Sequence, residues 1–256
     1  MVRTAASLPI LTFHTIDDHP SVISVSPNVF GRGMARLWES GYRTVSLLEV
    51  VDCLRRGVPF PDRSFVITFD DGYQSVYDEA FPVLQRHGMS AIVFLTVGEK
   101  GTAGLGDRLP SLAGRSMLSW RQIREMHRGG IAFGAHTLTH PDLTRLPSDQ
   151  VEAEVCRSKA TIEDTLSAPV ACFAYPYGRS DQRSREIIRR HFVCACSDRL
   201  GLVTIDSDPY TLERVDAYYL RTDRLFAVML TRLFPWYVLA RSLPRRVRRA
   251  VRGVLK

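Results

Sequence analysis

Two adjacent aspartates, Asp70 and Asp71, end an apolar run in the stretch SFVITFDDGYQSVY. Neighbouring carboxylates repel each other, so a chain that places them together needs a partner for their charge. Further along, FGAHTLTHPDL carries His136 and His140, four residues apart. Two imidazoles and one carboxylate form a ligand set suited to zinc and neighbouring divalent metals, with positions left for water and substrate. If Asp71 is the third ligand, the cation neutralises one carboxylate and leaves Asp70 free to take a proton.

The elements that must position these residues alternate regularly along the chain. Short β-rich apolar runs are separated by segments of helical period, which is typical of a parallel sheet covered by helices. The expected strands run from Leu8 to Phe13, Arg43 to Leu47, Phe65 to Phe69, Ser90 to Val97, Ile131 to Phe133, Val170 to Ala174 and Phe192 to Cys196. The expected helices run from Pro27 to Ser40, Leu48 to Arg56, Ser75 to His87, Ser119 to Arg128, Pro147 to Leu166 and Asp181 to Arg190.

The polar candidates fall where these strands end. His14 follows the first strand, the aspartate pair the third, His136 the fifth, and AYPYGRSD the sixth. In an α/β barrel the carboxyl ends of the strands converge on one face, where active sites are built. Seven strands therefore predict a distorted (β/α) TIM-like barrel, with an open doubly wound sheet as the alternative.

Three stretches carry a family resemblance: TFDDG at 68–72, HTLTHPDL at 136–143 and FAYPYG at 173–178. In this order they resemble the leading motifs of the polysaccharide deacetylases, also called the NodB-homology superfamily or carbohydrate esterase family 4. The resemblance spans roughly residues 8–214. It implies a distorted barrel and a metal-dependent hydrolase that removes acetyl groups from N-acetylated sugars. By motif position Asp70 would be the general base, with Asp71, His136 and His140 as ligands of zinc, or of cobalt, nickel or manganese.

Further residues are expected around the same site. The backbone N–H of Tyr177 matches the family's oxyanion-hole position, and we expect Tyr73, Tyr175 and Pro176 to contact the substrate. Taken alone, FAYPYG would also pass for an ordinary turn after a buried strand.

The sequence departs from the family pattern in the residue that orients the base. Many members carry an arginine in the third motif, and the matching position here is Ala174. Arg214, in YTLERVDAY, is the candidate replacement, and a surface arginine in an ion pair is the alternative reading of that residue.

The general acid is the second departure, because no late Leu-x-His motif is present. The only histidine after His140 is His191, which precedes an expected strand and so falls at the wrong end of the barrel. His14, in LTFHTIDD, resembles the early Tyr-His motif of the poly-N-acetylglucosamine deacetylase branch. It is the candidate to protonate the leaving amine, and a packing role is the alternative.

Composition narrows the class and the compartment. Residues 241–256 hold seven of the 34 basic residues and no acid, so the remaining 27 basic and 27 acidic residues cancel and the net +7 is local. That distribution argues against nucleic acid as a partner. The five cysteines are an odd number in apolar surroundings, which predicts reduced thiols. The apolar stretch near the start is too short for a signal peptide, so we expect a cytoplasmic protein.

The last part of the chain changes in character, so we divide it into a barrel at 1–222 and an apolar, basic helical tail at 223–256. LFAVMLTRLFPWYVLA is interrupted by Arg232 and Pro235 and is too short to span a membrane. The following RSLPRRVRRAVRGVLK predicts a basic amphipathic helix at the inner-membrane surface. A helix packed on the barrel, with a solvated basic end, is the alternative.

The site residues and the family resemblance together favour a metal-dependent N-deacetylase acting on N-acetylhexosamine units of a polysaccharide or lipid-linked saccharide. If the tail docks on the inner membrane, a lipid-linked saccharide or a nascent exopolysaccharide is the expected substrate. Two alternatives stay open. One is a carbohydrate-binding pseudoenzyme that lacks a competent acid, and the other is an amidohydrolase acting on a non-sugar amide.

Overall fold

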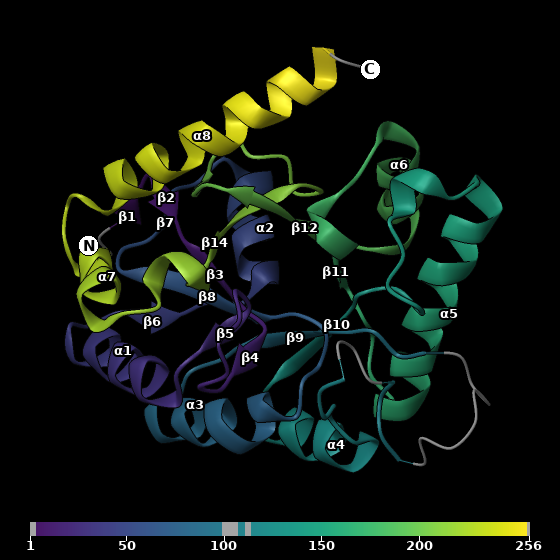
Figure 1. Cartoon of the computed structure of the whole chain (residues 1–256), viewed down its shortest axis with the longest axis horizontal. Coiled ribbons are helices and arrows are strands. Elements are labelled where there is room, and N and C mark those ends of the chain that lie inside the picture. Colours follow the sequence, from purple (N-terminus) through teal and green to yellow (C-terminus); the bar gives the residue numbers. More distant parts are fainter. Residues whose placement is uncertain (1–3, 99–106, 111–113, 255–256) are drawn as a thin grey trace.

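Seven parallel strands form a closed barrel with helices around it (Figure 1). The computed structural model describes residues 4–98, 107–110 and 114–254. Around the ring the strands are β3 (Ile10–Phe13), β14 (Leu212–Asp216), β12 (Cys194–Leu200), β11 (Cys172–Ala174), β10 (Ala132–Ala135), β9 (Ile92–Leu95) and β8 (Ser64–Phe69). Parallel pairing of β3 with β8 closes the ring. The distorted seven-stranded barrel is confirmed, and the open sheet is excluded.

One member of the ring differs from the expected set. The expected strand from Arg43 to Leu47 forms only β6 (Arg43–Thr44), which pairs with the start of β8 beside the ring. The seventh place belongs to β14, which was not predicted as a strand. Its sequence LERVD carries three charged residues, which hide the apolar pattern of a buried strand. Contacts inside the barrel, not local pattern, decide its place.

The helices lie close to their expected positions. They are α1 (Pro27–Glu39), α2 (Leu47–Arg56), the π-helical turn η1 (Val76–Ala80) leading into α3 (Phe81–His87), α4 (Trp120–Arg128), α5 (Ser148–Leu166) and α6 (Gln182–His191). Capping boxes begin α2, with Ser46 and Glu49, and α4, with Ser119 and Gln122. The short elements are β1 (Thr4–Ala5), β2 (Ser7–Leu8), β4 (Thr15–Ile16), β5 (Ser24–Val25), β7 (Phe60–Pro61), β13 (Val203–Thr204), η2 (Leu143–Arg145), η3 (Pro176–Gly178) and η4 (Ala217–Leu220).

Alternation along the strands divides the core into an inner and an outer part. Residues such as Ile10 and Val66 fill the barrel together with apolar side chains of α2. Their neighbours Leu11 and Ile67 belong to the larger cluster formed with the surrounding helices. This arrangement gives the strands buried residues on both faces, as parallel strands require.

The inside of the barrel becomes polar near the carboxyl ends of β3, β8 and β14. Thr12 and Thr68 are hydrogen-bonded through their hydroxyl oxygens at 3.1 Å, and Arg214 Nη1 donates to Thr68 Oγ1 at 3.3 Å. All three side chains are buried. A fixed polar layer therefore lies beneath the residues that follow β8.

The first portion of the chain after residue 222 packs against the barrel. It comprises α7 (Asp223–Ala227), η5 (Val228–Leu230) and α8 (Phe234–Val254). Phe226, Met229, Phe234 and Val238 are buried in the larger core cluster, so the alternative of a packed helix describes this portion. Within the described ranges, no helix is long and apolar enough to cross a membrane. All five cysteines are free thiols.

Candidate active site and metal centre

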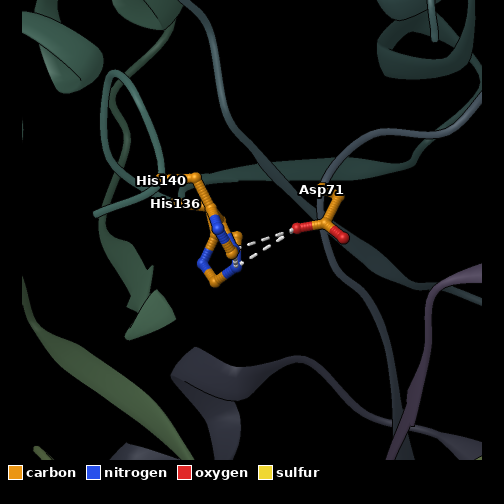
Figure 2. Close-up of side chains that lie close together, drawn as sticks. All are labelled: Asp71, His136 and His140. Atoms are coloured by element: carbon orange, nitrogen blue, oxygen red, sulfur yellow. Dashed lines mark hydrogen bonds and ion pairs between the residues drawn. The ribbon is translucent and has the colours of Figure 1, made fainter. Parts of the chain in front are cut away.

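Asp71, His136 and His140 point toward one another at the carboxyl end of the barrel (Figure 2). Asp71 Oδ1 lies 3.4 Å from Nε2 of His136 and 3.4 Å from Nε2 of His140. The two Nε2 atoms are 3.2 Å apart. Oxygen and nitrogen ligands about 2.0–2.1 Å from a tetrahedral zinc ion are separated by about 3.3 Å. The three atoms thus have the mutual spacing of three corners of a tetrahedral metal site.

Two further observations show that these residues fit a divalent cation. Asp71 Oδ1 is buried and has no hydrogen-bond partner among the described residues, although it faces two imidazole rings. A buried carboxylate oxygen without a partner is costly, and a cation at the centre of the three atoms would supply one. His136 Nδ1 lies 2.7 Å from the carbonyl oxygen of Ala174, which fixes the ring with Nε2 toward the centre.

The charges of these residues are strongly coupled. Burial and the neighbouring His136 lower the pKa of His140 to about 4, so its imidazole is neutral near pH 7. Burial opposes a charge on His136, but the two aspartates outweigh it and raise the pKa of His136. Burial alone would raise the pKa of Asp71. Its interactions with His136 lower it by more than that, so the pKa of Asp71 lies below its ordinary value. Near pH 7 Asp71 is therefore ionised and His140 neutral, the forms in which these groups bind a metal ion.

The backbone around the site is strained. Six non-glycine residues of the described chain have positive φ angles, and four of them lie here: Asp71 (73°), Thr137 (70°), His140 (62°) and Tyr177 (56°). Each such residue costs free energy and persists only where the surrounding structure enforces it. This concentration of strain marks the carboxyl end of the barrel as a functional site.

Glu154 of α5 holds the loop that carries the two histidines. Its carboxylate accepts hydrogen bonds from the backbone N–H groups of Leu138 (2.9 Å) and Thr139 (2.8 Å) and from the Thr139 hydroxyl (2.6 Å). The Thr137 hydroxyl in turn accepts from the backbone N–H of His140 at 3.0 Å. Sequence reasoning missed Glu154, because a glutamate on an amphipathic helix is most simply read as a surface residue.

Asp70 is held by Arg214 rather than by the metal ligands. Arg214 Nη1 donates to Asp70 Oδ1 at 2.8 Å, and Nη2 donates to Oδ2 at 2.7 Å. Only 4% of the Arg214 side chain and 5% of the Asp70 side chain are exposed, so the alternative of a surface ion pair is excluded. Arg214 Nε also donates to the Ser197 carbonyl at 2.8 Å, which fixes the guanidinium.

The ion pair also sets the protonation of Asp70. Burial alone would raise its pKa, but Arg214 and His136 more than compensate and hold it well below the ordinary value. Asp70 is therefore ionised and oriented at neutral pH, as a proton acceptor must be. Ala174 cannot provide this cation, and Arg214 reaches the same carboxylate from β14.

His14 and Tyr177 border the same site. His14 Nε2 lies 4.0 Å from Asp70 Oδ2, and 24% of its side chain is exposed. The Tyr177 ring packs edge-on against His140, with centroids 4.7 Å apart, and the residue is 56% exposed. Both are accessible to a bound molecule beside the three converging atoms.

The residues expected to contact substrate are placed differently. Tyr73 is 3% exposed, Tyr175 is 0% exposed, and Pro176 is buried. Tyr175 packs edge-on against Phe173 inside the outer core. These residues support the loops around the site, and direct contact with a substrate stays a prediction.

Sequence comparison identifies the family. The family description "Polysaccharide deacetylase" matches residues 57–193, more than half of the chain. The chain belongs to the polysaccharide deacetylase family. Among curated members it is 28% identical over 211 residues to YxkH of Bacillus subtilis strain 168, covering 82% of this chain and 71% of YxkH. It is 31% identical over 137 residues to the poly-beta-1,6-N-acetyl-D-glucosamine N-deacetylase of Escherichia coli K12, covering 50% of this chain and 20% of that protein.

Solved structures of proteins named as deacetylases share the fold. IcaB from Ammonifex degensii superposes with a TM-score of 0.73 at 25% identity, covering 89% of this chain and 97% of IcaB. The Streptococcus pyogenes deacetylase PplD in complex with acetate gives a TM-score of 0.73 at 24% identity, covering 84% and 93% of the two chains. The similarity therefore extends well beyond the segment that carries the motifs.

Substituting the two aspartates separately tests their different positions in this deacetylase-family site. Asp71→Ala removes one of three converging donors and should lower the bound divalent metal by one ion per chain. Asp70→Asn should retain that ion, because Asp70 is paired with Arg214 and does not belong to the three converging donors. The measurement is metal content by mass spectrometry after zinc loading and gel filtration. Equal zinc content in wild type and Asp71→Ala would contradict the assignment.

Replacing Arg214 tests the buried ion pair. Arg214→Met leaves an uncompensated buried carboxylate, which should lower the free energy of unfolding by roughly 3–5 kcal/mol at pH 7. Asp70 has a depressed folded-state pKa, so the stability it confers is present above its unfolded value of about 3.9 and is lost as the pH falls. The difference in the free energy of unfolding between wild type and Arg214→Met should therefore become smaller below about pH 4.

The measurement is chemical denaturation at several pH values with a chelator present. Arg32→Met is the matched control, because Arg32 pairs with Asp223 on the surface, where the side chains are 53% and 38% exposed. Its effect on the free energy of unfolding should be much smaller than that of Arg214→Met at every pH, because solvent screens an exposed ion pair. If Arg214→Met lowered the free energy of unfolding by the same amount at every pH, the loss of the ion pair with Asp70 would not be the cause.

Proposed function

We propose that this chain is a divalent-metal-dependent hydrolase that removes N-acetyl groups from N-acetylhexosamine units of a polysaccharide or lipid-linked saccharide. The observation that carries the proposal is the division of labour between adjacent aspartates. Asp71 Oδ1 converges with two histidine nitrogens at 3.4 Å, while Asp70 faces Arg214 beside them. A base and a cation site side by side are what amide hydrolysis by an activated water requires.

Each residue then has a defined task. A divalent cation held by Asp71, His136 and His140 would polarise the acetyl carbonyl and acidify water. Asp70 accepts the proton of the attacking water, and Arg214 keeps Asp70 ionised and aimed, although it also lowers its basicity.

Two further groups complete the proposed reaction. The backbone N–H of Tyr177 is assigned to the developing oxyanion, beside the His140 ring that it contacts. His14, 4.0 Å from Asp70, is assigned to protonate the leaving amine. Zinc is the favoured metal because the donors are two imidazoles and one carboxylate, and cobalt, nickel and manganese are alternatives.

The substrate class rests on the relatives. Besides the Escherichia coli protein, the poly-beta-1,6-N-acetyl-D-glucosamine N-deacetylase of Staphylococcus epidermidis is 28% identical over 181 residues, covering 67% of this chain and 60% of that protein. These proteins are named for an N-acetylglucosamine polymer, which supports an acetylated hexosamine as the substrate unit here.

The pseudoenzyme alternative loses part of its basis. Two departures from the family pattern supported it, Ala174 and the missing late histidine. Arg214 supplies the cation that Ala174 lacks, so only the identity of the acid still favours a catalytically impaired protein. A non-sugar amide would use the same base and cation site.

Acetate release distinguishes these functions. The zinc-loaded protein should release acetate from β-1,6-linked N-acetylglucosamine oligomers. Asp70→Asn should lower the rate by on the order of 10²–10⁴ while its metal content is unchanged. Asp52→Asn is the matched control, since Asp52 is an exposed partner of Arg56 on α2. Bound metal without turnover on any acetylated amide would establish the pseudoenzyme, and release only from non-sugar amides would establish the amidohydrolase.

A further inference from the structure

A second group of metal-ligating side chains lies on the outer layer of the barrel. Glu152 and Cys156 are four residues apart on α5, which places them on the same face of that helix. His191 ends α6, which packs beside α5 (Figure 1). His191 is hydrogen-bonded to Glu152 Oε1, and Cys156 Sγ lies 3.5 Å from His191 Nε2 and 3.6 Å from Glu152 Oε1.

The two distances from Cys156 Sγ fit a shared metal ion, whereas Nε2 of His191 and Oε1 of Glu152 form a hydrogen bond of 2.5 Å and would separate to about 3.3 Å on binding one. A thiolate at about 2.3 Å and a nitrogen or oxygen at about 2.0–2.1 Å from a tetrahedral ion are separated by about 3.6 Å. Both distances from Cys156 Sγ match this value. Arg190 Nη2 hydrogen-bonds the other carboxylate oxygen of Glu152, Oε2, and so leaves Oε1 directed at the sulfur and the imidazole.

This cluster is distinct from the catalytic site. His191 precedes β12 by only a few residues, so it lies near the amino ends of the strands, whereas the deacetylase motifs follow the carboxyl ends. The side chains of Glu152 and His191 are 36% and 26% exposed, so an ion can reach them. The proposed reaction uses none of these residues.

We propose that Glu152, Cys156 and His191 form a second divalent-metal site, selective for zinc-like ions, that links α5 to α6. Binding replaces the Cys156 thiol proton and the proton between Glu152 and His191, while the imidazole keeps one proton on Nδ1. The ligand set of sulfur, nitrogen and oxygen leaves a fourth position for water. Because α5 also supplies Glu154, the site fastens the helix that holds the histidine loop.

Cobalt substitution tests this site independently of catalysis. The catalytic site contains only nitrogen and oxygen donors, so a sulfur-to-cobalt charge-transfer band can arise only where a thiolate binds. The cobalt-loaded wild type should show this band, and Cys156→Ser should lose it together with one ion per chain. Asp71→Ala should keep the band, and Cys53→Ser, which changes a half-buried thiol on α2, should not affect it.

The outcomes that would overturn the site are equally direct. No band in the wild type, or a band that persists in Cys156→Ser, would show that these residues do not bind the ion. Protection of the Cys156 thiol from alkylation by added zinc gives a second readout on the unmodified protein. Absence of that protection would also count against the site.

The solvent-facing side of α8 carries exposed apolar side chains. Phe234, Val238 and Ser242 are buried against the barrel. Trp236, Leu239 and Leu243, at spacings of three and four residues, are 69%, 40% and 52% exposed. Leu233, just before the helix, is 67% exposed. The start of α8 therefore carries an apolar stripe directed away from the core.

The sequence continues the same apolar spacing and is rich in basic residues. Val247, Ala250 and Val254 continue the spacing of three and four residues, and residues 241–256 contain seven basic residues and no acidic ones. Figure 1 shows α8 running along the barrel and extending past it. Unbalanced positive charge beside an apolar stripe with an exposed tryptophan is complementary to an anionic lipid surface.

We infer that α8 lies on an anionic lipid surface as a peripheral helix. In this arrangement Leu233, Trp236, Leu239 and Leu243 enter the interface, and the net positive charge of residues 241–256 attracts the helix to anionic headgroups. This would place the barrel at a membrane surface, where a lipid-linked or nascent saccharide is presented. The inference depends on the proposed function only for that last consequence.

Binding of the full chain to lipid vesicles tests whether α8 lies on an anionic lipid surface. The protein should sediment with phosphatidylcholine vesicles that contain phosphatidylglycerol, release at high salt, and not bind phosphatidylcholine alone. Trp236→Ser combined with Leu243→Ser should weaken binding by on the order of tenfold or more. Trp38→Ser is the control, since Trp38 is 42% exposed on α1. Unchanged vesicle binding in the double variant would overturn the inference. So would a wild-type protein that is dimeric in solution and becomes monomeric in the double variant, because the stripe would then bind a second copy of the chain.

Discussion

Asp70 and Arg214 form a two-pronged ion pair that is almost completely buried at the carboxyl end of the barrel. Two charges in this position are tolerable only because each satisfies the other and the guanidinium also meets Ser197 and Thr68. The pair explains why β14 completes the ring despite its charged sequence. It also separates the two neighbouring aspartates, since Asp70 is paired with Arg214 whereas Asp71 faces His136 and His140.

The second constraint is backbone geometry. Asp71, Thr137 and His140 all have positive φ angles, which non-glycine residues avoid unless other contacts enforce them. Glu154 provides such contacts by binding the loop between the two histidines from α5. The ligand atoms are thereby brought to spacings of 3.2–3.4 Å by the protein itself. A cation would enter a site already shaped for it.

The outer layer carries features that the catalytic site does not explain. Glu152, Cys156 and His191 join two helices by groups that commonly bind metals, on the helix that also supplies Glu154. On another side, α8 buries one face against the barrel and exposes Trp236 and Leu243 on the other. Both features lie outside the barrel interior, so they can change without altering the base or its ion pair.

The sequence by itself determined the residues that follow the carboxyl ends of strands: Asp70, Asp71, His136 and His140. Their types and order suffice because a parallel barrel brings successive strand ends to one face. It also indicated most helices, whose apolar period is local. Arg214 was named as a candidate, but a charged pentapeptide gives no local sign of a buried strand. Only the tertiary structure decided that β14 closes the ring, that Glu154 holds the histidine loop, and that Tyr175 is buried instead of exposed. Each of these depends on how separate strands, helices and loops pack against one another, which no local pattern of residues records.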